Sequence, residues 1–127
     1  MLIAIALISG TMLLTPVIKG ATAAGLEPSA AVLLMNREKA VVVDVCQPEE
    51  FAAGHVVGAK NIPLADLEAK LPGAVKNKTV PLILVCQSGV RSGKAVAAAK
   101  KLGYEQAQSL GGGMQAWKAA NLPVEKA

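Results

Sequence analysis

The sequence predicts a small α/β domain with a mostly parallel β-sheet, and an apolar segment in front of it. Two runs predict the sheet, because residues 41–45 and 81–85 are rich in β-branched and other apolar side chains and have the length of strands. Strands that are apolar on both faces are typical of a parallel sheet covered by helices. Helical patterns lie between and around these runs, and such alternation is the signature of an α/β fold. The chain of 127 residues has room for one such domain and one appendage.

The apolar segment comes first along the chain. Residues 1–18 contain no charged side chain, and Lys19 follows them directly. A helix of this length spans roughly 27 Å at about 1.5 Å per residue, near the lower limit for crossing a bilayer core. We therefore expect a transmembrane anchor at residues 1–18 and a short linker at residues 19–25. A cleaved signal peptide is the alternative, since residues 21–23 read Ala-Thr-Ala, although no basic side chain precedes the apolar run.

Charge predicts how this anchor is oriented. Lys19 and the lysines of residues 26–127 all follow the apolar segment, and only the amino terminus precedes it. The positive-inside rule then predicts a single-pass protein of the cytoplasmic (inner) membrane with its α/β domain facing the cytoplasm. A reducing compartment would keep both cysteines as thiols.

The elements of the domain at residues 26–127 follow from local signals. Proline favours the first turn of a helix, so Pro28 and Pro48 mark two helix starts, and Gly54 and Gly103 mark helix ends. The expected order is a helix at 28–36, a strand at 41–45, a short helix from 48 to 54, a weak strand at 60–62, a helix at 64–71 that ends before Pro72, a strand at 81–85, a helix at 92–102, a weak strand at 106–110 and a helix at 114–120, which Trp117 anchors to the core.

Composition excludes several function classes. Hydrophobic residues make up 53% of the chain and aromatic residues 2%, so recognition of single-stranded nucleic acid by base stacking is not expected. The net charge of +4 comes from scattered lysines and favours solubility or attraction of anions over DNA binding. Two cysteines are too few for a disulfide scaffold or a four-cysteine zinc site.

The chemistry is expected at one edge of the sheet. Ligands of such sheets bind beyond the carboxyl ends of the strands, and Cys46 and Cys86 each follow one of the two strong strands directly.

Residues 86–92 read Cys-Gln-Ser-Gly-Val-Arg-Ser and run from a strand into a helix. Free N–H groups and the helix dipole at such a position lower a cysteine pKa from about 8.5 into the range of roughly 3.5–7.5. Gly89 lets the loop curl around the sulfur, and Arg91 offers a planar fork to an oxyanion. An inert buried cysteine is the alternative, and it leaves the polar loop and the arginine unexplained.

These residues, together with several motifs in order along the chain, resemble the rhodanese (sulfurtransferase) domain family. The resemblance extends over residues 26–124. The motifs that carry it are Asp44-Val45, residues 48–51, residues 54–63, the loop at 86–92, residues 111–114 and Trp117.

The resemblance implies an open α/β sheet of about five strands and a sulfur-transfer reaction without a metal or an organic cofactor. Cys86 would be the nucleophile that takes sulfane sulfur from a thiosulfate-like donor and passes it as a persulfide to a thiophilic acceptor, either cyanide or an unknown protein. The persulfide would be held by the backbone N–H groups of the loop, and Arg91 would also help to bind an anionic donor. The loop residues are Gln87, Ser88, Gly89, Val90 and Arg91.

Two details qualify the resemblance. Four residues separate Cys86 from Arg91, whereas cysteine-dependent phosphatases use five, so phosphatase activity is not expected. Cys46 stands where the family often has an arginine, which removes one cation from the mouth of the site and puts strong thiosulfate turnover in doubt. Two other functions stay open: a non-catalytic binding module at the membrane, and a thiol redox protein in which Cys46 forms a reversible disulfide with Cys86.

Three further residues have expected structural roles. His55 is expected to belong to a structural turn, because a thiolate activated by its loop needs no general base. Asp44 is expected to accept hydrogen bonds from neighbouring loop amides, because an unpaired buried carboxylate would be costly. Trp117 is expected to pack in the core.

Overall fold

The computed structural model describes residues 21–22 and 25–126. The expected anchor at residues 1–18 lies outside these residues, as does most of the linker. Among the helices of the described residues, none is both long and apolar enough to cross a bilayer.

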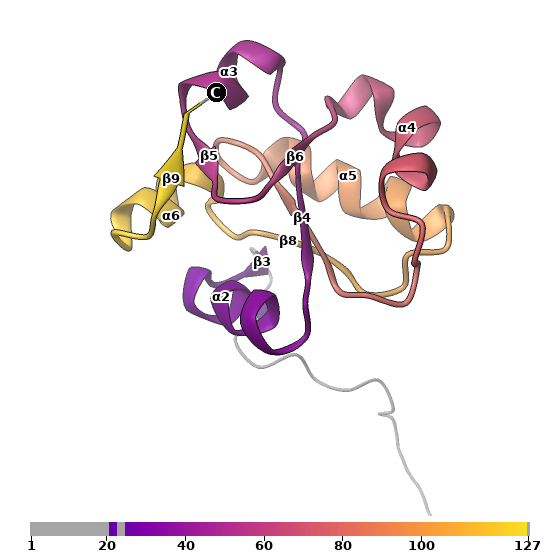
Figure 1. The fold of residues 1–127 in the computed structure, drawn as a ribbon, viewed down its shortest axis with the longest axis horizontal. Helices are drawn as coiled ribbons and strands as arrows, with labels where there is room; N and C mark the ends of the chain where they lie inside the picture. The colour runs from indigo at the N-terminus through magenta and orange to yellow at the C-terminus, as the bar shows by residue number, and fades with distance from the viewer. Residues whose placement is uncertain (1–20, 23–24, 127) are drawn as a thin grey trace, which may run out of the picture.

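The centre of the molecule is a parallel sheet of four strands in the order β6-β4-β7-β8 (Figure 1). The strands are β4 (Val41–Asp44), β6 (Lys60–Asn61), β7 (Leu82–Val85) and β8 (Ala107–Ser109). A single parallel bridge from Leu26 to Leu110 brings β3 (Gly25–Leu26) next to the β8 edge. The prediction of a mostly parallel sheet is confirmed, including the pairing of the two strong strands, β4 and β7.

The sheet is buried on both faces, as its apolar strands predict. Successive residues of β4 and β7 point to opposite sides, so the two faces have separate cores. One core lies under α4 (Leu67–Ala74) and α5 (Val90–Lys101), and the other lies under α2 (Pro28–Arg37) and α6 (Gly113–Ala119). Trp117 is buried in the second core, where its indole N–H donates to the Pro123 carbonyl at 2.9 Å. Its expected packing role is confirmed.

The helix that was expected at residues 64–71 differs from the prediction. A 3₁₀ turn, η1 (Leu64–Asp66), comes first, and α4 then continues to Ala74 with Pro72 inside it. Proline keeps a helical φ, and the hydrogen bond it cannot make would end on the carbonyl of the exposed Glu68, which water can reach. The Tyr104 hydroxyl donates to the Val75 carbonyl at 2.5 Å and lies 3.3 Å from the Leu71 carbonyl oxygen, and this tertiary contact holds the last turn of the helix.

Two antiparallel pairs of two-residue strands had no signal in the sequence. β5 (His55–Val56) pairs with β9 (Val124–Glu125), and β2 (Ala21–Thr22) pairs with β3. His55 is 5% exposed, its ring stacks on Phe51 at 3.6 Å, and its Nδ1 contacts the Phe51 carbonyl oxygen at 2.7 Å. His55 is therefore structural, as expected.

Candidate functional site

Cys86 follows β7 directly, at the carboxyl edge of the sheet and next to the end of β4. The loop after it is short because Gly89, with φ of +102°, already begins the turn into α5. This backbone conformation favours glycine. Helix α5 therefore begins at Val90, two residues before the predicted start, and this places Arg91 and Ser92 in its first turn.

The loop is held from outside by the start of α6. Gly113 lies so close that a Cβ atom there would overlap the Cys86 carbonyl oxygen. That carbonyl accepts a hydrogen bond from the Met114 N–H at 2.8 Å, and the Gln87 carbonyl accepts one from the Gln115 N–H at 3.2 Å. The glycine-rich motif at residues 111–114 therefore sets the shape of the cysteine loop.

Hydrogen-bond donors surround the Cys86 sulfur. The Gly89 and Ser92 N–H groups donate to it at 3.0 and 3.3 Å, and the Ser92 hydroxyl lies 3.5 Å away. Burial, the strongest influence, raises the pKa of the thiol, but the hydrogen bonds from Ser92, Gly89 and Ser88 together outweigh it and hold the pKa below its ordinary value. A thiol at this position is poised to react as a thiolate, which is the nucleophilic form of cysteine.

The Ser92 hydroxyl has a second partner. Its Oγ lies 2.7 Å from the Ser109 Oγ of β8 and 3.2 Å from the Gly89 carbonyl oxygen, to which it donates. A hydroxyl group has a single hydrogen to donate. While Cys86 is a thiol, its S–H donates to the Ser92 Oγ and the Ser92 hydrogen goes to the Gly89 carbonyl; once Cys86 is a thiolate, the Ser92 hydrogen is available to the sulfur.

The guanidinium of Arg91 has an anionic partner in this structure. Its Nη1 and Nη2 donate to the two carboxylate oxygens of Glu50 at 2.7 and 2.9 Å, and both side chains are about one third exposed. Arg91 holds the pKa of Glu50 at about 2, well below its ordinary value. The residues lie 41 positions apart, and the fold brings the first turn of α3 (Pro48–Ala53) beside the first turn of α5.

The other expected loop residues occupy different positions. The Gln87 side chain turns toward the second cysteine, and its Nε2 donates to the Cys46 Sγ at 3.7 Å. The Ser88 and Val90 side chains lie at the surface, and Val90 is 67% exposed. Among the described residues, the sulfur therefore receives its close hydrogen bonds from Gly89 and Ser92, and Ser92 was not among the predicted loop donors.

Cys46 is buried beside the site in a different environment. Burial, the strongest influence, and then Asp44 raise the pKa of its thiol to about 12. The Asp44 Oδ1 accepts the Cys46 N–H at 2.9 Å, which confirms that Asp44 binds a neighbouring amide. Asp44 itself is fully buried, and burial raises its pKa. Both cysteines are free, and Cys46 stays protonated at neutral pH, which disfavours it as the attacking thiol of a disulfide exchange.

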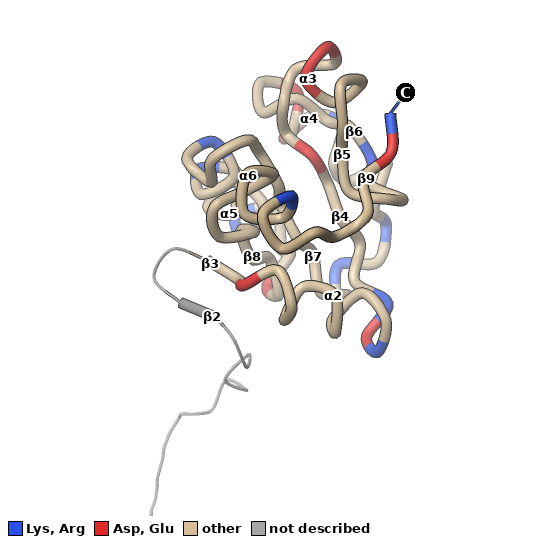
Figure 2. The backbone as a smooth tube through the Cα atoms, turned by 90° about the vertical axis from the view of Figure 1, so that its left-hand side faces the viewer, with Lys and Arg blue, Asp and Glu red and all other residues tan. Residues whose placement is uncertain are grey.

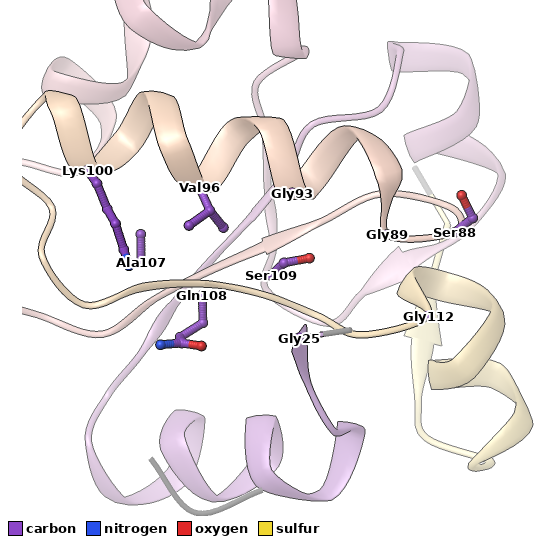
Figure 3. Close-up of a pocket in the computed structure, with 10 residues that line it drawn as sticks. All are labelled: Gly25, Ser88, Gly89, Gly93, Val96, Lys100, Ala107, Gln108, Ser109 and Gly112. Atoms are coloured by element: carbon purple, nitrogen blue, oxygen red, sulfur yellow. The ribbon is translucent and has the colours of Figure 1, made fainter. Parts of the chain in front are cut away.

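An open cavity of about 580 Å³ lies between α5 and β8 and reaches the cysteine loop at one end (Figure 3). Ser88 and Gly89 line it from the loop, Val96 and Lys100 from α5, and residues 107–109 from β8. Cys86 is not among the residues that line this cavity. Within residues 25–126, no cluster of three His, Cys, Asp or Glu side chains is placed to hold a metal ion.

Sequence reasoning missed three residues of this arrangement. Ser92 had a local signal, because a hydroxyl in the first turn of a helix that follows a cysteine loop lies close to the sulfur. Glu50 and Ser109 had none, because each reaches the site from another element through the tertiary fold.

Comparisons with known proteins agree with this geometry. The sequence profile of the rhodanese-like domain matches residues 27–120. The chain is 40% identical over 79 residues to an uncharacterized protein, YqhL, of Bacillus subtilis, covering 62% of this chain and 61% of that protein. It is 35% identical over 100 residues to the thiosulfate sulfurtransferase GlpE of Pseudomonas putida, covering 79% of this chain and 88% of that protein.

A solved structure has the same fold. The human single-domain sulfurtransferase TSTD1 superimposes with a TM-score of 0.66 at 32% identity, covering 77% of this chain and 97% of that one. The chain spans less than two thirds of the length of the Bacillus subtilis relative.

Proposed function

The chain belongs to the rhodanese-like domain family, and from that premise we propose that it is a sulfurtransferase that carries sulfane sulfur as a persulfide on Cys86. The observation that carries the proposal is the Cys86 sulfur, which accepts N–H groups from Gly89 and Ser92 at 3.0 and 3.3 Å. Relatives with the names thiosulfate sulfurtransferase and single-domain sulfurtransferase support the same chemistry.

The reaction has two half-reactions. In the first, the Cys86 thiolate attacks the outer sulfur of a donor such as thiosulfate, a new S–S bond forms, the donor's S–S bond breaks, and sulfite leaves with the electron pair. In the second, a thiophilic acceptor such as cyanide attacks the outer sulfur of the persulfide. Thiocyanate leaves, and the Cys86 thiolate is restored. Neither half-reaction needs a metal or an organic cofactor, and a protein thiol could replace cyanide as the acceptor.

The loop stabilises the charged sulfur in both states. The thiolate and the persulfide each carry a negative charge, and N–H groups aimed at such a charge stabilise it without reorganising. We propose that the loop from Gln87 to Arg91 closes around the outer sulfur of the persulfide. Gly113 supports this role, because its close contact with the Cys86 carbonyl fixes the loop before the donor arrives.

Intact mass spectrometry of the purified full-length chain tests the proposal. Treatment with thiosulfate or with a thiol persulfide should add the mass of one sulfur atom, and cyanide should remove it. Cys86→Ser should gain no sulfur, whereas the matched variant Cys46→Ser should gain one. If neither donor adds sulfur to the wild-type chain, the non-catalytic binding module becomes the better interpretation. If Cys46→Ser cannot be loaded, the redox pairing of the two cysteines becomes the better one.

We also propose that residues 1–18 anchor the domain at the cytoplasmic face of the inner membrane. The uncharged segment and the lysines that follow it support this placement. The full-length chain should stay in the membrane fraction after alkaline carbonate extraction. A cytoplasm-active reporter fused after Ala127 should be active, and a periplasm-active one inactive. Release by carbonate, or the opposite reporter pattern, would contradict the proposal.

A further inference from the structure

The cation nearest to the reacting sulfur in sequence, Arg91, already has an anionic partner. Glu50 binds its guanidinium through both oxygens, at 2.7 and 2.9 Å, and this two-point geometry satisfies the planar fork that would otherwise receive an oxyanion. Glu50 is itself fixed, because its Oε1 also accepts the Gln47 N–H at 2.9 Å in the capping box of α3. The carboxylate is therefore built into the fold.

The charges around Cys86 are unfavourable for a dianion. The pKa of Arg91 is raised, first by its hydrogen bonds to Glu50 and to a smaller extent by the charge of a Cys86 thiolate, so the guanidinium lies within electrostatic range of the Cys86 sulfur. Cys46, where an arginine would add a second cation, is an uncharged thiol at neutral pH. An incoming donor therefore meets the Cys86 thiolate, one guanidinium and one carboxylate.

Figure 2 shows the acidic positions of α3 and of the end of β4 at the same end of the molecule. Asp44 and Glu50 are the carboxyl groups there whose charges influence the Cys46 thiol. Thiosulfate brings two negative charges to this region, and it can use the Arg91 fork only by displacing Glu50. A donor with at most one negative charge meets much less repulsion.

We propose that Glu50 is a specificity-determining residue that directs the site away from dianionic donors such as thiosulfate and toward the persulfides of thiols. This inference rests on the proposed sulfur transfer at Cys86. In the favoured reaction, the Cys86 thiolate attacks the outer sulfur of a neutral hydropersulfide, R–S–SH. The donor's S–S bond breaks, and R–S⁻ leaves with the electron pair. The proton of the new Cys86 hydropersulfide then passes to R–S⁻, which leaves a Cys86 persulfide anion and R–SH, so no external oxidant or reductant is needed.

The test measures the first half-reaction alone. The rate at which Cys86 gains sulfur is followed by intact mass in the full-length chain, at a series of concentrations of thiosulfate or of 2-hydroxyethyl persulfide. Glu50→Gln removes the charge and keeps a side chain that can complete a capping box. Glu49→Gln is the matched control, because Glu49 is an exposed acid in the same helical turn. Thermal unfolding of each variant verifies that it is folded.

Glu50→Gln should lower the half-saturating concentration of thiosulfate about fivefold to tenfold and change that of the persulfide by less than about twofold. Glu49→Gln should change neither. If Glu50 acts through Arg91, its effect should vanish in an Arg91→Gln background, and this double-mutant cycle separates a charge effect on the fork from a general structural one.

Three results would overturn the inference. Equal shifts for both donors would mean that Glu50 has no role in selectivity. A thiosulfate shift that persists in the Arg91→Gln background would mean that Glu50 does not act by occupying the fork. Both of these results, with sulfur loading intact, would overturn the inference alone. A wild-type chain that gains sulfur from neither donor would overturn the inference together with the proposed function.

Discussion

Two strand–loop–helix units lie side by side in this molecule, and each has a cysteine after its strand. In β4–α3 the cysteine is Cys46, and in β7–α5 it is Cys86. The strands are neighbours in register and both thiols are buried, yet the pKa of Cys46 is raised to about 12 and the pKa of Cys86 is lowered.

Burial raises the pKa of both thiols, but Asp44 raises that of Cys46 further, whereas hydrogen bonds lower that of Cys86. The two units also differ in how the following helix uses its free N–H groups. Helix α3 begins with Pro48, which has no N–H, and its third N–H bonds the Gln47 side chain in the capping box. Helix α5 begins after Gly89, which has no side chain to cap the helix, so the Gly89 and Ser92 N–H groups remain for the Cys86 sulfur. A strand-end cysteine becomes acidic where the next helix leaves its N-terminal donors uncapped.

The comparison predicts a difference in reactivity between the two thiols, and this is the largest expected effect. At neutral pH, iodoacetamide should alkylate Cys86 about a hundredfold faster than Cys46 in the folded chain. Peptide mapping by mass spectrometry after timed quenching measures both rates in one sample. Denaturant should make the two rates similar, which serves as the control. Equal rates in the folded chain would contradict the comparison.

The second prediction concerns the free energy of unfolding at alkaline pH. The folded pKa of Cys46 is raised to about 12, so its stabilising contribution is complete below the pKa of an unfolded cysteine, about 8.5, and is lost as pH rises from there toward 12. Cys46→Val removes the titrating group and should flatten this part of the stability curve in denaturant unfolding.

The titration of other groups does not interfere with this comparison of unfolding free energies. Burial also raises the pKa of Tyr104, but that contribution is common to both proteins, so the difference between wild type and Cys46→Val isolates Cys46. Cys86 acts with the opposite sign, because its lowered pKa gives stability above the unfolded pKa that is lost as pH falls through the folded one. Identical alkaline curves for wild type and Cys46→Val would show that Cys46 titrates normally.

The third prediction removes one donor from the favoured thiolate. Ser92→Ala deletes the hydroxyl that lies 3.5 Å from the Cys86 sulfur and leaves the backbone donors in place. The pKa of Cys86 should rise, and alkylation near neutral pH should slow about tenfold. The pH dependence of the alkylation rate distinguishes this from a loss of folding, because the rate at high pH should stay close to that of wild type. An unchanged pH profile would show that the backbone donors suffice.

The smallest expected effect is at Ser109, which contacts the sulfur only through Ser92. Ser109→Ala should slow alkylation near neutral pH about twofold to threefold, because the Ser92 hydroxyl loses the partner that orients it. Ser109→Thr keeps a hydroxyl group and should restore the rate. In a Ser92→Ala background, Ser109→Ala should have no further effect. An effect that persists there would show that Ser109 acts by another route.

The part of the site that comes from one short stretch of the chain was predictable from the sequence. Cys86, the glycine that turns the loop and the start of α5 lie within residues 86–92, so the chain itself brings the donors to the sulfur. The partner of Arg91 was not predictable, because Glu50 lies 41 positions away and many acids in the sequence could have paired with it. The sequence therefore predicted the hydrogen-bond donors around Cys86 but not the ion pair of Arg91.

The fold shows the same distinction between features that depend on local sequence and features that depend on tertiary contacts. The runs at 41–45 and 81–85 predicted the central strands because burial on both faces requires continuous apolar residues. The pairs β2–β3 and β5–β9 have two residues per strand, too few for any alternation to show. The end of α4 was predicted wrongly at Pro72, because the Tyr104 hydroxyl holds the Leu71 and Val75 carbonyls in the folded molecule.

The sequence by itself determined the α/β class, the central strands and the position of Cys86 before uncapped N–H groups, because each depends on the periodicity of apolar residues or on neighbours within one turn. The tertiary structure alone decided that the pKa of the Cys46 thiol is raised, that Glu50 pairs with the guanidinium of Arg91 and that Ser109 contacts Ser92. Each of these depends on burial or on a hydrogen bond between distant elements, and neither exists until the helices have packed onto the sheet.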